Sequence, residues 1–392
     1  MNRASRKIWD TLTSLSLTIV CLAALMVLVV ACTLAQVRLG TVGAVALYMR
    51  SWFYWMDLGS FRIPIFPAGA TVGLVLVVNL VAAQVRRLKL TWSKAGIWIV
   101  HAGLILLFAG EFVTAGYQTD AQLAIEQGQT ANSIEVPREM ELAIVDASDP
   151  AVDDVYGVPE RALARGGTIP IPGTPLSVRV REYHRNAQIL RGMTGASPVT
   201  QGAGAGLVVQ PLPPVTSDEQ QDLSAAVVDV MAGGASLGTW LATNGLQQPQ
   251  PFQAAGRSWT LALRPRRVYL PYTLTLKKFS HDVYPGTDIP KNFSSLVRLV
   301  NPTTGEDRDV LIYMNQPLRY DGKAFYQASF GKGDTLSILQ VVANPGWLIP
   351  YISCVLVTLG LLVHFAISLR RGVRRAGAAQ EKPEQRAQEA SA

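Results

Sequence analysis

The chain has 392 residues, of which 49% are hydrophobic and only 16% are charged. Ordinary soluble proteins carry about 25% charged residues, so this composition, with long stretches free of charge, indicates a membrane protein. The formal net charge is +7. The basic residues crowd at the ends of apolar runs and no basic stripe alternates with aromatics, which argues against a nucleic-acid-binding surface.

The three cysteines, Cys21, Cys32 and Cys354, all lie inside apolar runs. The polar part of the chain is therefore expected to fold without disulfides. No CxxC pair occurs, which excludes thiol–disulfide exchange by this chain and the usual zinc sites.

Four apolar runs are long enough to cross a bilayer core of roughly 30 Å as helices. We predict transmembrane helices at residues 15–37, 65–85, 95–115 and 347–369. The first run follows basic residues, as a signal peptide would. It is too long for one and lacks a clear cleavage site, so we expect a retained anchor.

Basic residues set the predicted topology. They concentrate at the N-terminus, in the loop RRLKLTWSK at 86–94, and in RRGVRR at 370–375. The positive-inside rule places all three segments in the cytoplasm. The predicted domains are 1–116 with three helices and an external aromatic loop, 117–346 as an external domain, 347–369 as the fourth helix, and 370–392 as a cytoplasmic, disordered tail.

The first external segment contains LYMRSWFYWMDL at residues 47–58. Its four consecutive aromatics, Trp52 to Trp55, predict a short helix that lies at the level of the lipid headgroups. A substrate-binding aromatic platform is the alternative.

The large external segment, 117–346, alternates apolar and polar residues in short stretches bounded by Gly, Pro, Asn and Asp. This pattern predicts an antiparallel, sandwich-like β-rich domain with little helix. The Gly- and Pro-rich stretch 195–221 is expected to be a mobile loop outside the core. The predicted fold is thus a bundle of four transmembrane helices that carries a β-rich domain.

Two of the four histidines, His101 and His364, lie inside apolar runs. An imidazole in hydrocarbon is costly without a partner, so each is a hypothesis for function. Each lies about six residues, or roughly 9 Å, from the cytoplasmic end of its helix, a depth that suits a ligand to haem iron. A hydrogen bond between helices, or snorkelling to the interface, is the alternative. Nearby Arg370 and Arg371 favour this alternative for His364, and both readings stay open for His101.

Other polar residues point to no catalytic chemistry. Asn79 is expected to hydrogen-bond across the bundle and Glu111 to reach the interface. His184 and His281 in the external domain have no cysteine or second histidine at ligand spacing. Hydrolase, metalloprotease, P-loop and dinucleotide motifs do not occur in a supporting context. We therefore expect the external domain to be a binder or scaffold, and we assign no catalytic residue.

Five stretches together resemble the ResB family, also called CcsB, of System II cytochrome c biogenesis. The most specific is residues 272–330, with the pattern YPGT, PK.F.S and then N.PL.Y.G..FYQ.S. The others are the opening helix at 9–36, SWFYW with NLVAAQVRRLK at 79–89, SKAGIWIVHAGLILLFAGEF at 93–112 and the closing helix at 343–365. Residues 150–260 contribute little.

The resemblance implies a subunit of a cytochrome c synthase complex that helps carry haem b across the membrane to apocytochrome c. A ResC-like (CcsA-like) membrane protein is the implied partner, and a thioredoxin-like reductant acts indirectly on the cysteines of the apocytochrome. The third-helix histidine of the family maps onto His101, which makes His101 the implied axial haem ligand; His364 has no clear counterpart. The chain lacks the Trp-rich motif of ResC, so a separate partner is expected.

Two rival interpretations keep the membrane anchor but not the haem chemistry. One is a membrane-anchored β-domain that acts as a scaffold or sensor and binds no haem. The other is a transporter subunit, for which broken helices and polar sites at the bilayer midplane are expected. Only Asn79 and the two helical histidines are candidates for such sites.

Overall fold

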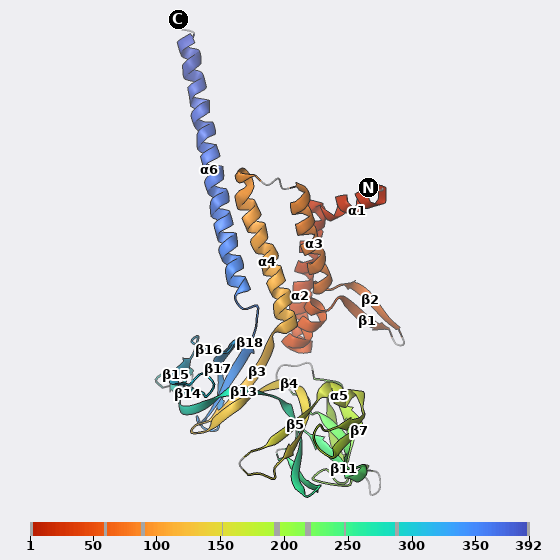
Figure 1. Ribbon diagram of the computed structural model, residues 1–392. Coiled ribbons are helices and arrows are strands. Elements are labelled where there is room, and N and C mark those ends of the chain that lie inside the picture. The colour runs from red at the N-terminus through yellow and green to blue at the C-terminus, as the bar shows by residue number, and fades with distance from the viewer. Residues whose placement is uncertain are drawn as a thin grey trace. The chain divides into compact units, whose positions relative to one another are not determined.

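The computed structural model describes residues 3–58, 61–87, 91–150, 152–191, 197–215, 221–246, 248–286 and 290–389 (Figure 1). The chain forms two compact units. One, the helical unit, comprises Met1–Gln118 and Asn344–Ala392, and the other, the β unit, comprises Thr119–Ala343.

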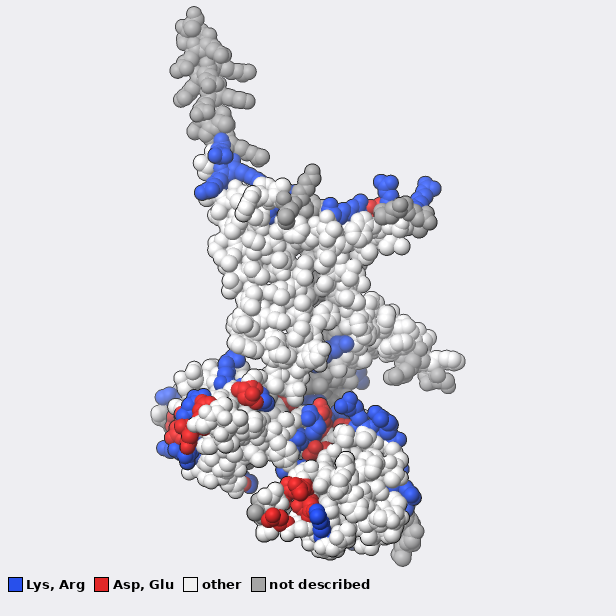
Figure 2. All heavy atoms as spheres, in the orientation of Figure 1, with Lys and Arg blue, Asp and Glu red and all other residues white. Residues whose placement is uncertain are grey.

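The helical unit contains the four predicted membrane helices. Its elements are α1 (Arg3–Leu12), α2 (Leu15–Val45), a π-helical turn (Ala46–Arg50), β1 (Phe53–Leu58), β2 (Phe61–Pro67), α3 (Gly69–Arg87), α4 (Ala95–Tyr117) and α6 (Ile349–Glu389). Among the described residues, four segments are long and apolar enough to span a bilayer: Leu15–Arg50, Gly69–Arg86, Trp92–Tyr117 and Ile349–Arg374. Figure 2 shows these helices almost free of charge over most of their length. The prediction of a four-helix membrane protein is confirmed.

Helices α4 and α6 pack antiparallel with their backbones in close contact. Gly96, Gly103 and Gly110 recur every seven residues along α4 and all face α6. A Cβ added at Gly96 would lie 2.4 Å from the backbone nitrogen of His364. Such an approach is possible only for glycine, which explains why small residues recur on this face.

Asn79 of α3 ties the start of the chain to the bundle. Its amide nitrogen donates to the carbonyls of Leu12 at 2.7 Å and Ser14 at 3.1 Å, and its oxygen accepts from the Thr18 hydroxyl at 2.6 Å. At the end of α3, Arg86 pairs with Asp10 of the amphipathic helix α1 at 2.5 Å. The expectation that Asn79 hydrogen-bonds across the bundle is confirmed.

The aromatic segment between α2 and α3 is a β-hairpin, so the prediction of a short helix at 47–58 is wrong apart from the π-helical turn. Strands β1 and β2 pair antiparallel, and Tyr54 stacks on Phe66 with ring centroids 4.9 Å apart and on Tyr48 at 5.2 Å. Consecutive aromatics favour strands, because alternate rings can then stack on one face. Trp55 and Phe61 stay exposed, and the hairpin also takes in residues 65–67, which were predicted to belong to the second span.

The C-terminal segment is helical as far as Glu389, whereas the sequence predicted a disordered tail from residue 370. Alanine, glutamate, glutamine and arginine dominate this segment and are strong helix formers. They extend α6 beyond its apolar part in spite of Pro383.

The β unit is built almost entirely from antiparallel strands, as predicted. Its largest sheet has ten strands, in the order β15-β14-β13-β4-β3-β18-β17-β16, with β12 beside β13 and β5 beside β4. The bounds are β3 (Thr119–Glu126), β4 (Thr130–Asp146), β5 (Asp154–Pro159), β12 (Gln250–Ala254), β13 (Arg257–Val283), β14 (Pro290–Asn301), β15 (Glu306–Tyr313), β16 (Leu318–Tyr320), β17 (Lys323–Gly331) and β18 (Leu336–Ala343).

Two smaller sheets and a short helix complete the β unit. The four-stranded sheet has the order β11-β10-β7-β6, and β8 pairs with β9. The bounds are α5 (Glu160–Arg165), β6 (Gly167–Pro170), β7 (Leu176–His184), β8 (Ala187–Arg191), β9 (Leu207–Pro211), β10 (Ala225–Ala232) and β11 (Ala235–Thr243).

The long strand β13 links two hydrophobic cores. Its first part places Trp259 in a core with the four-stranded sheet, and its second part places Tyr272 and Leu274 in a core with β14, β17 and β18. The strand is 27 residues long and its pairing with β4 shifts register between Pro265 and Arg266. A proline cannot donate to the ladder, and the irregularity lets one strand contribute to two cores.

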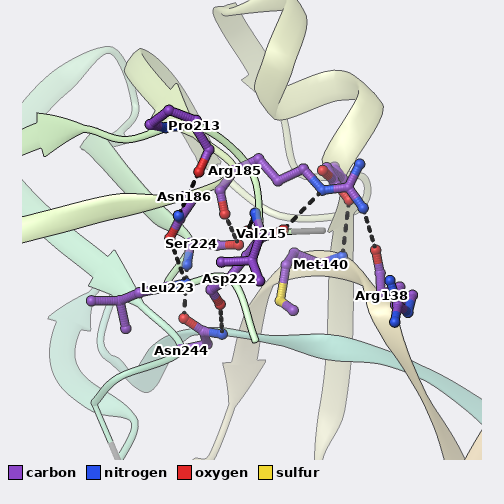
Figure 3. A network of polar contacts seen from close by, with 11 residues as sticks. Arg138, Met140, Arg185, Asn186, Pro213, Val215, Asp222, Leu223, Ser224 and Asn244 are labelled. Carbon is purple, nitrogen blue, oxygen red and sulfur yellow. Dashed lines mark hydrogen bonds and ion pairs between the residues drawn. The ribbon is translucent and has the colours of Figure 1, made fainter. Parts of the chain in front are cut away.

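Part of the Gly- and Pro-rich stretch 195–221 belongs to the folded β unit, contrary to the prediction that it lies outside the core. Val199 is buried and packs with Leu207 and Val209 of β9. Asn186 holds the C-terminal part of this stretch, because its amide nitrogen donates to the Pro213 carbonyl at 2.7 Å and its oxygen accepts from the backbone of Leu223, just after the stretch, at 3.0 Å (Figure 3). Residues 195, 196 and 216–220 lie outside the described part.

Candidate functional site

His101 lies on the side of α4 that faces away from α6. It follows Gly96 by five residues, which at about 100° per residue places it roughly 140° around the helix. Seven residues further, on the same side as His101, Phe108 packs against a cluster of Cys21 and Leu28 of α2 with Val72 and Leu76 of α3. The half-buried imidazole is therefore on the α2–α3 side of α4.

The hydrogen bond of His101 fixes its tautomer. Its Nδ1 lies 2.8 Å from the backbone carbonyl oxygen of Ile97, one turn earlier in α4. A carbonyl oxygen only accepts hydrogen bonds, so Nδ1 must carry the proton and donate it. In the neutral ring this leaves the lone pair on Nε2, which is the arrangement that orients metal-ligating histidines.

His364 has different surroundings. Its side chain is exposed on α6, and no hydrogen bond joins it to another described residue. Its backbone lies beside Gly96, whereas His101 is five residues, or about 7.5 Å, further along α4 and on another face. The structure therefore does not bring the two histidines together as a pair of ligands within this chain.

One buried polar residue of the helical unit was missed in the sequence. Gln84 of α3 is only 5% exposed, and both polar atoms of its amide lack a hydrogen-bond partner among the described residues. A glutamine within an apolar helical run was the available signal, because polar groups inside membrane helices are rare and tend to be functional.

The other two histidines, His184 and His281, are part of the β unit's own packing. His184 pairs with Glu182 at 3.2 Å at the end of β7. The His281 ring packs against Phe293 and Phe330, with centroid distances of 5.1 Å and 4.5 Å, and its Nδ1 lies 3.3 Å from Asp334. Within the described ranges, no group of three His, Cys, Asp or Glu residues is arranged to hold a metal ion.

The strand region that contains His281 matches a known protein family. Residues 252–338, from β12 into β18, match the model of the ResB-like family. This segment is ResB-like. The matched segment includes residues 272–330, so the resemblance found in the sequence is confirmed.

The chain also has a curated relative. It is 36% identical over 102 residues to Protein NrfI of Wolinella succinogenes, a stretch that covers 26% of this chain and 11% of NrfI. The chain thus matches only a small part of that longer protein. The family match itself lies in the β unit and does not include His101 on α4.

Proposed function

We propose that this chain is a subunit of a cytochrome c biogenesis complex. It holds haem in the membrane through His101 and, with a ResC-like partner, delivers it to apocytochrome c. The ResB-like segment at 252–338 supports the role in biogenesis. The haem step is supported by the hydrogen bond and the burial of a single side chain, His101.

The geometry of His101 fits an iron ligand. Its Nδ1 proton is engaged by the Ile97 carbonyl at 2.8 Å, so the neutral ring presents its Nε2 lone pair. The imidazole is half-buried in an apolar helix. Haem is the cargo here, and when bound it supplies an iron with a free axial position and two vinyl groups for thioether formation. The contribution of His101 is to position that cargo.

The basic residues support a topology with both termini in the cytoplasm. Arg371 near the end of the apolar part of α6 donates to the Ser93 carbonyl at 3.3 Å, and Arg86 pairs with Asp10 of α1. Figure 2 shows Lys and Arg gathered at this one end of the helices. The positive-inside rule assigns that end to the cytoplasm, which puts the β unit outside.

The β unit offers an open strand edge for an extended polypeptide such as unfolded apocytochrome c. Strand β15 is the end strand of the large sheet beside β14, and its Leu311 is exposed, whereas the backbone of Tyr313 already bridges to Gln316. An extended peptide can add to such an edge through main-chain hydrogen bonds, with pockets or apolar side chains giving selectivity.

The decisive experiment replaces His101 with alanine in the full chain expressed with its partner. We expect His101→Ala to lower co-purifying haem and holocytochrome c sharply, and His364→Ala to have much less effect. Added imidazole should partly restore function in His101→Ala, because it can occupy the open axial position of the iron. An interhelical hydrogen bond, worth about 0.6–2 kcal/mol, would not be replaced in this way.

Two results would contradict the proposal. If His101→Ala keeps full haem at a normal protein level, the histidine is a packing residue. If the native pair carries no haem at all, the chain is a membrane-anchored scaffold or sensor.

A further inference from the structure

Gln84 carries an unpaired amide in the interior of the helical unit. The residue is 5% exposed, and neither Nε2 nor Oε1 has a hydrogen-bond partner among the described residues. An unsatisfied buried polar group costs about 1–3 kcal/mol, and apolar side chains of similar size would avoid this cost. Such a group is a candidate for binding something that the protein chain does not itself provide.

Asn79, five residues earlier on the same helix, is a buried amide that does have hydrogen-bond partners. Its amide is also buried, at 1% exposure, but it makes three hydrogen bonds, with the Leu12 and Ser14 carbonyls and the Thr18 hydroxyl. The bundle therefore satisfies a structural amide on α3 through its own residues. Gln84 has no such role.

The spacing along α3 shows which way Gln84 points. One face, with Val72, Leu76 and Asn79, packs on α1 and α2, and a second face is exposed. The exposed face consists of Leu74, Val78, Val81 and Val85. Gln84 lies on the third face, in line with Val77 and Leu80 at intervals of seven and four residues. This face is covered within the helical unit, and α3 packs against α4 as well as against α1 and α2.

Gln84 and His101 lie near the same end of the helical unit. Gln84 lies three residues before the end of α3, and His101 lies six residues after the start of α4, which is the next helix. At 1.5 Å per residue these are about 5 Å and about 9 Å from the same end of the bundle. Gln84 is thus closer to the headgroups than His101 is. A haem whose iron is held at His101 would extend past Gln84 if its carboxyl groups pointed to the headgroups.

We propose that the Gln84 amide binds a carboxyl group of the haem held at His101. This inference rests on the proposed function. A primary amide has one acceptor and two donors, and a carboxyl group complements both kinds. In surroundings of low polarity the protonated carboxylic acid is favoured, and its hydroxyl can donate to Oε1 while its carbonyl accepts from Nε2.

The test compares two porphyrins and two adjacent residues. Haem b and its dimethyl ester, which has no carboxyl groups, are titrated into the full-length chain in detergent and followed by the Soret band. Gln84→Met keeps the length of the side chain and removes its hydrogen bonds. Val85→Met is the matched control, because Val85 is 70% exposed on the outer face of the same helix.

We expect Gln84→Met to weaken haem b binding about tenfold, the factor that a net 1.4 kcal/mol hydrogen bond corresponds to. Binding of the dimethyl ester should weaken less than that of haem b, because its ester carbonyls can still accept from Nε2 but its ester groups cannot donate to Oε1. The thermal midpoint of the apo chain should stay the same or rise, since an unsatisfied buried amide is removed. Val85→Met should behave as wild type in all three measurements.

The outcomes separate this inference from the proposed function. If Gln84→Met binds haem b as tightly as wild type while His101→Ala loses it, the Gln84 assignment is wrong and the haem function stands. If both porphyrins weaken equally, or the midpoint falls, Gln84 is a structural residue. If His101→Ala binds haem b as wild type does, both proposals fall together.

Discussion

At the scale of single residues, the interior of the β unit contains charged groups that are kept ionised by specific partners. Asp229 on β10 is buried, and its carboxylate accepts hydrogen bonds from Arg181 Nε at 2.9 Å and the Thr239 hydroxyl at 2.6 Å. Burial alone would raise its pKa. The hydrogen bonds from Arg181 and Thr239, with the positive charges of Arg181 and Arg179, outweigh this effect and lower the pKa of Asp229.

The lowered pKa predicts how the stability depends on pH. A carboxyl group whose pKa is lower in the folded state adds stability above its unfolded pKa, about 3.9 for aspartate, and loses it as the pH falls through the folded pKa. We therefore expect Asp229→Asn to destabilise the protein at pH 7 and the deficit to shrink below about pH 4. Thermal unfolding at a series of pH values measures this. Asp153→Asn is the control, because Asp153 is exposed and makes no ion pair with another described residue. A deficit that does not change with pH would contradict the prediction.

At the scale of elements, glycine placement determines how α4 and α6 meet. Gly96, Gly103 and Gly110 lie against α6, where an added Cβ would be 2.4 Å, 2.8 Å and 2.6 Å from the nearest α6 atom. Ala102 and Ala109, which could also admit a flat ligand, are exposed instead. The small residues around His101 thus serve two purposes, since the glycines pack a helix and the alanines leave the other side open.

Adding one methyl group to this interface should separate the helices. We expect Gly96→Ala to destabilise the full chain by about 1–3 kcal/mol, because the methyl meets backbone and not a movable side chain. The thermal midpoint in detergent measures the loss. Gly116→Ala is the matched control on the same helix, because an added Cβ there has nothing within 4 Å and alanine favours the helix. Equal midpoints for the two variants would show that α4 and α6 do not need this close approach.

At the scale of the whole molecule, the chain consists of a membrane unit and a β unit with its own interior. The β unit, Thr119–Ala343, is one uninterrupted stretch of sequence with two hydrophobic cores. The helical unit is assembled from both ends of the chain. This arrangement lets the β unit be inserted between the third and fourth membrane helices without crossing connections.

A continuous unit with its own cores should fold without the helices. We expect residues 119–343, expressed alone, to give a strand-dominated circular dichroism spectrum and a cooperative unfolding transition. A mainly helical spectrum, or an unfolded one, would show that the helical unit is needed to form the sheets.

The topology can be tested on the intact chain. Basic residues gather at one end of the helices, which predicts that this end is cytoplasmic. A reporter that is active only in the cytoplasm should therefore be active when it is fused after Arg374. The same reporter inserted in the exposed turn at Gly233 should show the opposite behaviour. A cytoplasmic result at both positions would contradict an external β unit.

The sequence by itself determined the number of membrane helices and the β-rich nature of 117–346, because hydrophobic length and period-two alternation are local signals. It left both readings of His101 open. Three features were decided only by the tertiary structure. The aromatic segment at 53–67 became a hairpin because Tyr54 stacks on Phe66, which lies beyond a turn. Val199 joined the core because Asn186 and β8 hold its neighbours. The amide of Gln84 is buried in the tertiary structure without a hydrogen-bond partner among the described residues, and only this distinguishes it from other polar residues. Each depends on contacts between residues distant in sequence, and a local pattern cannot show which partners meet.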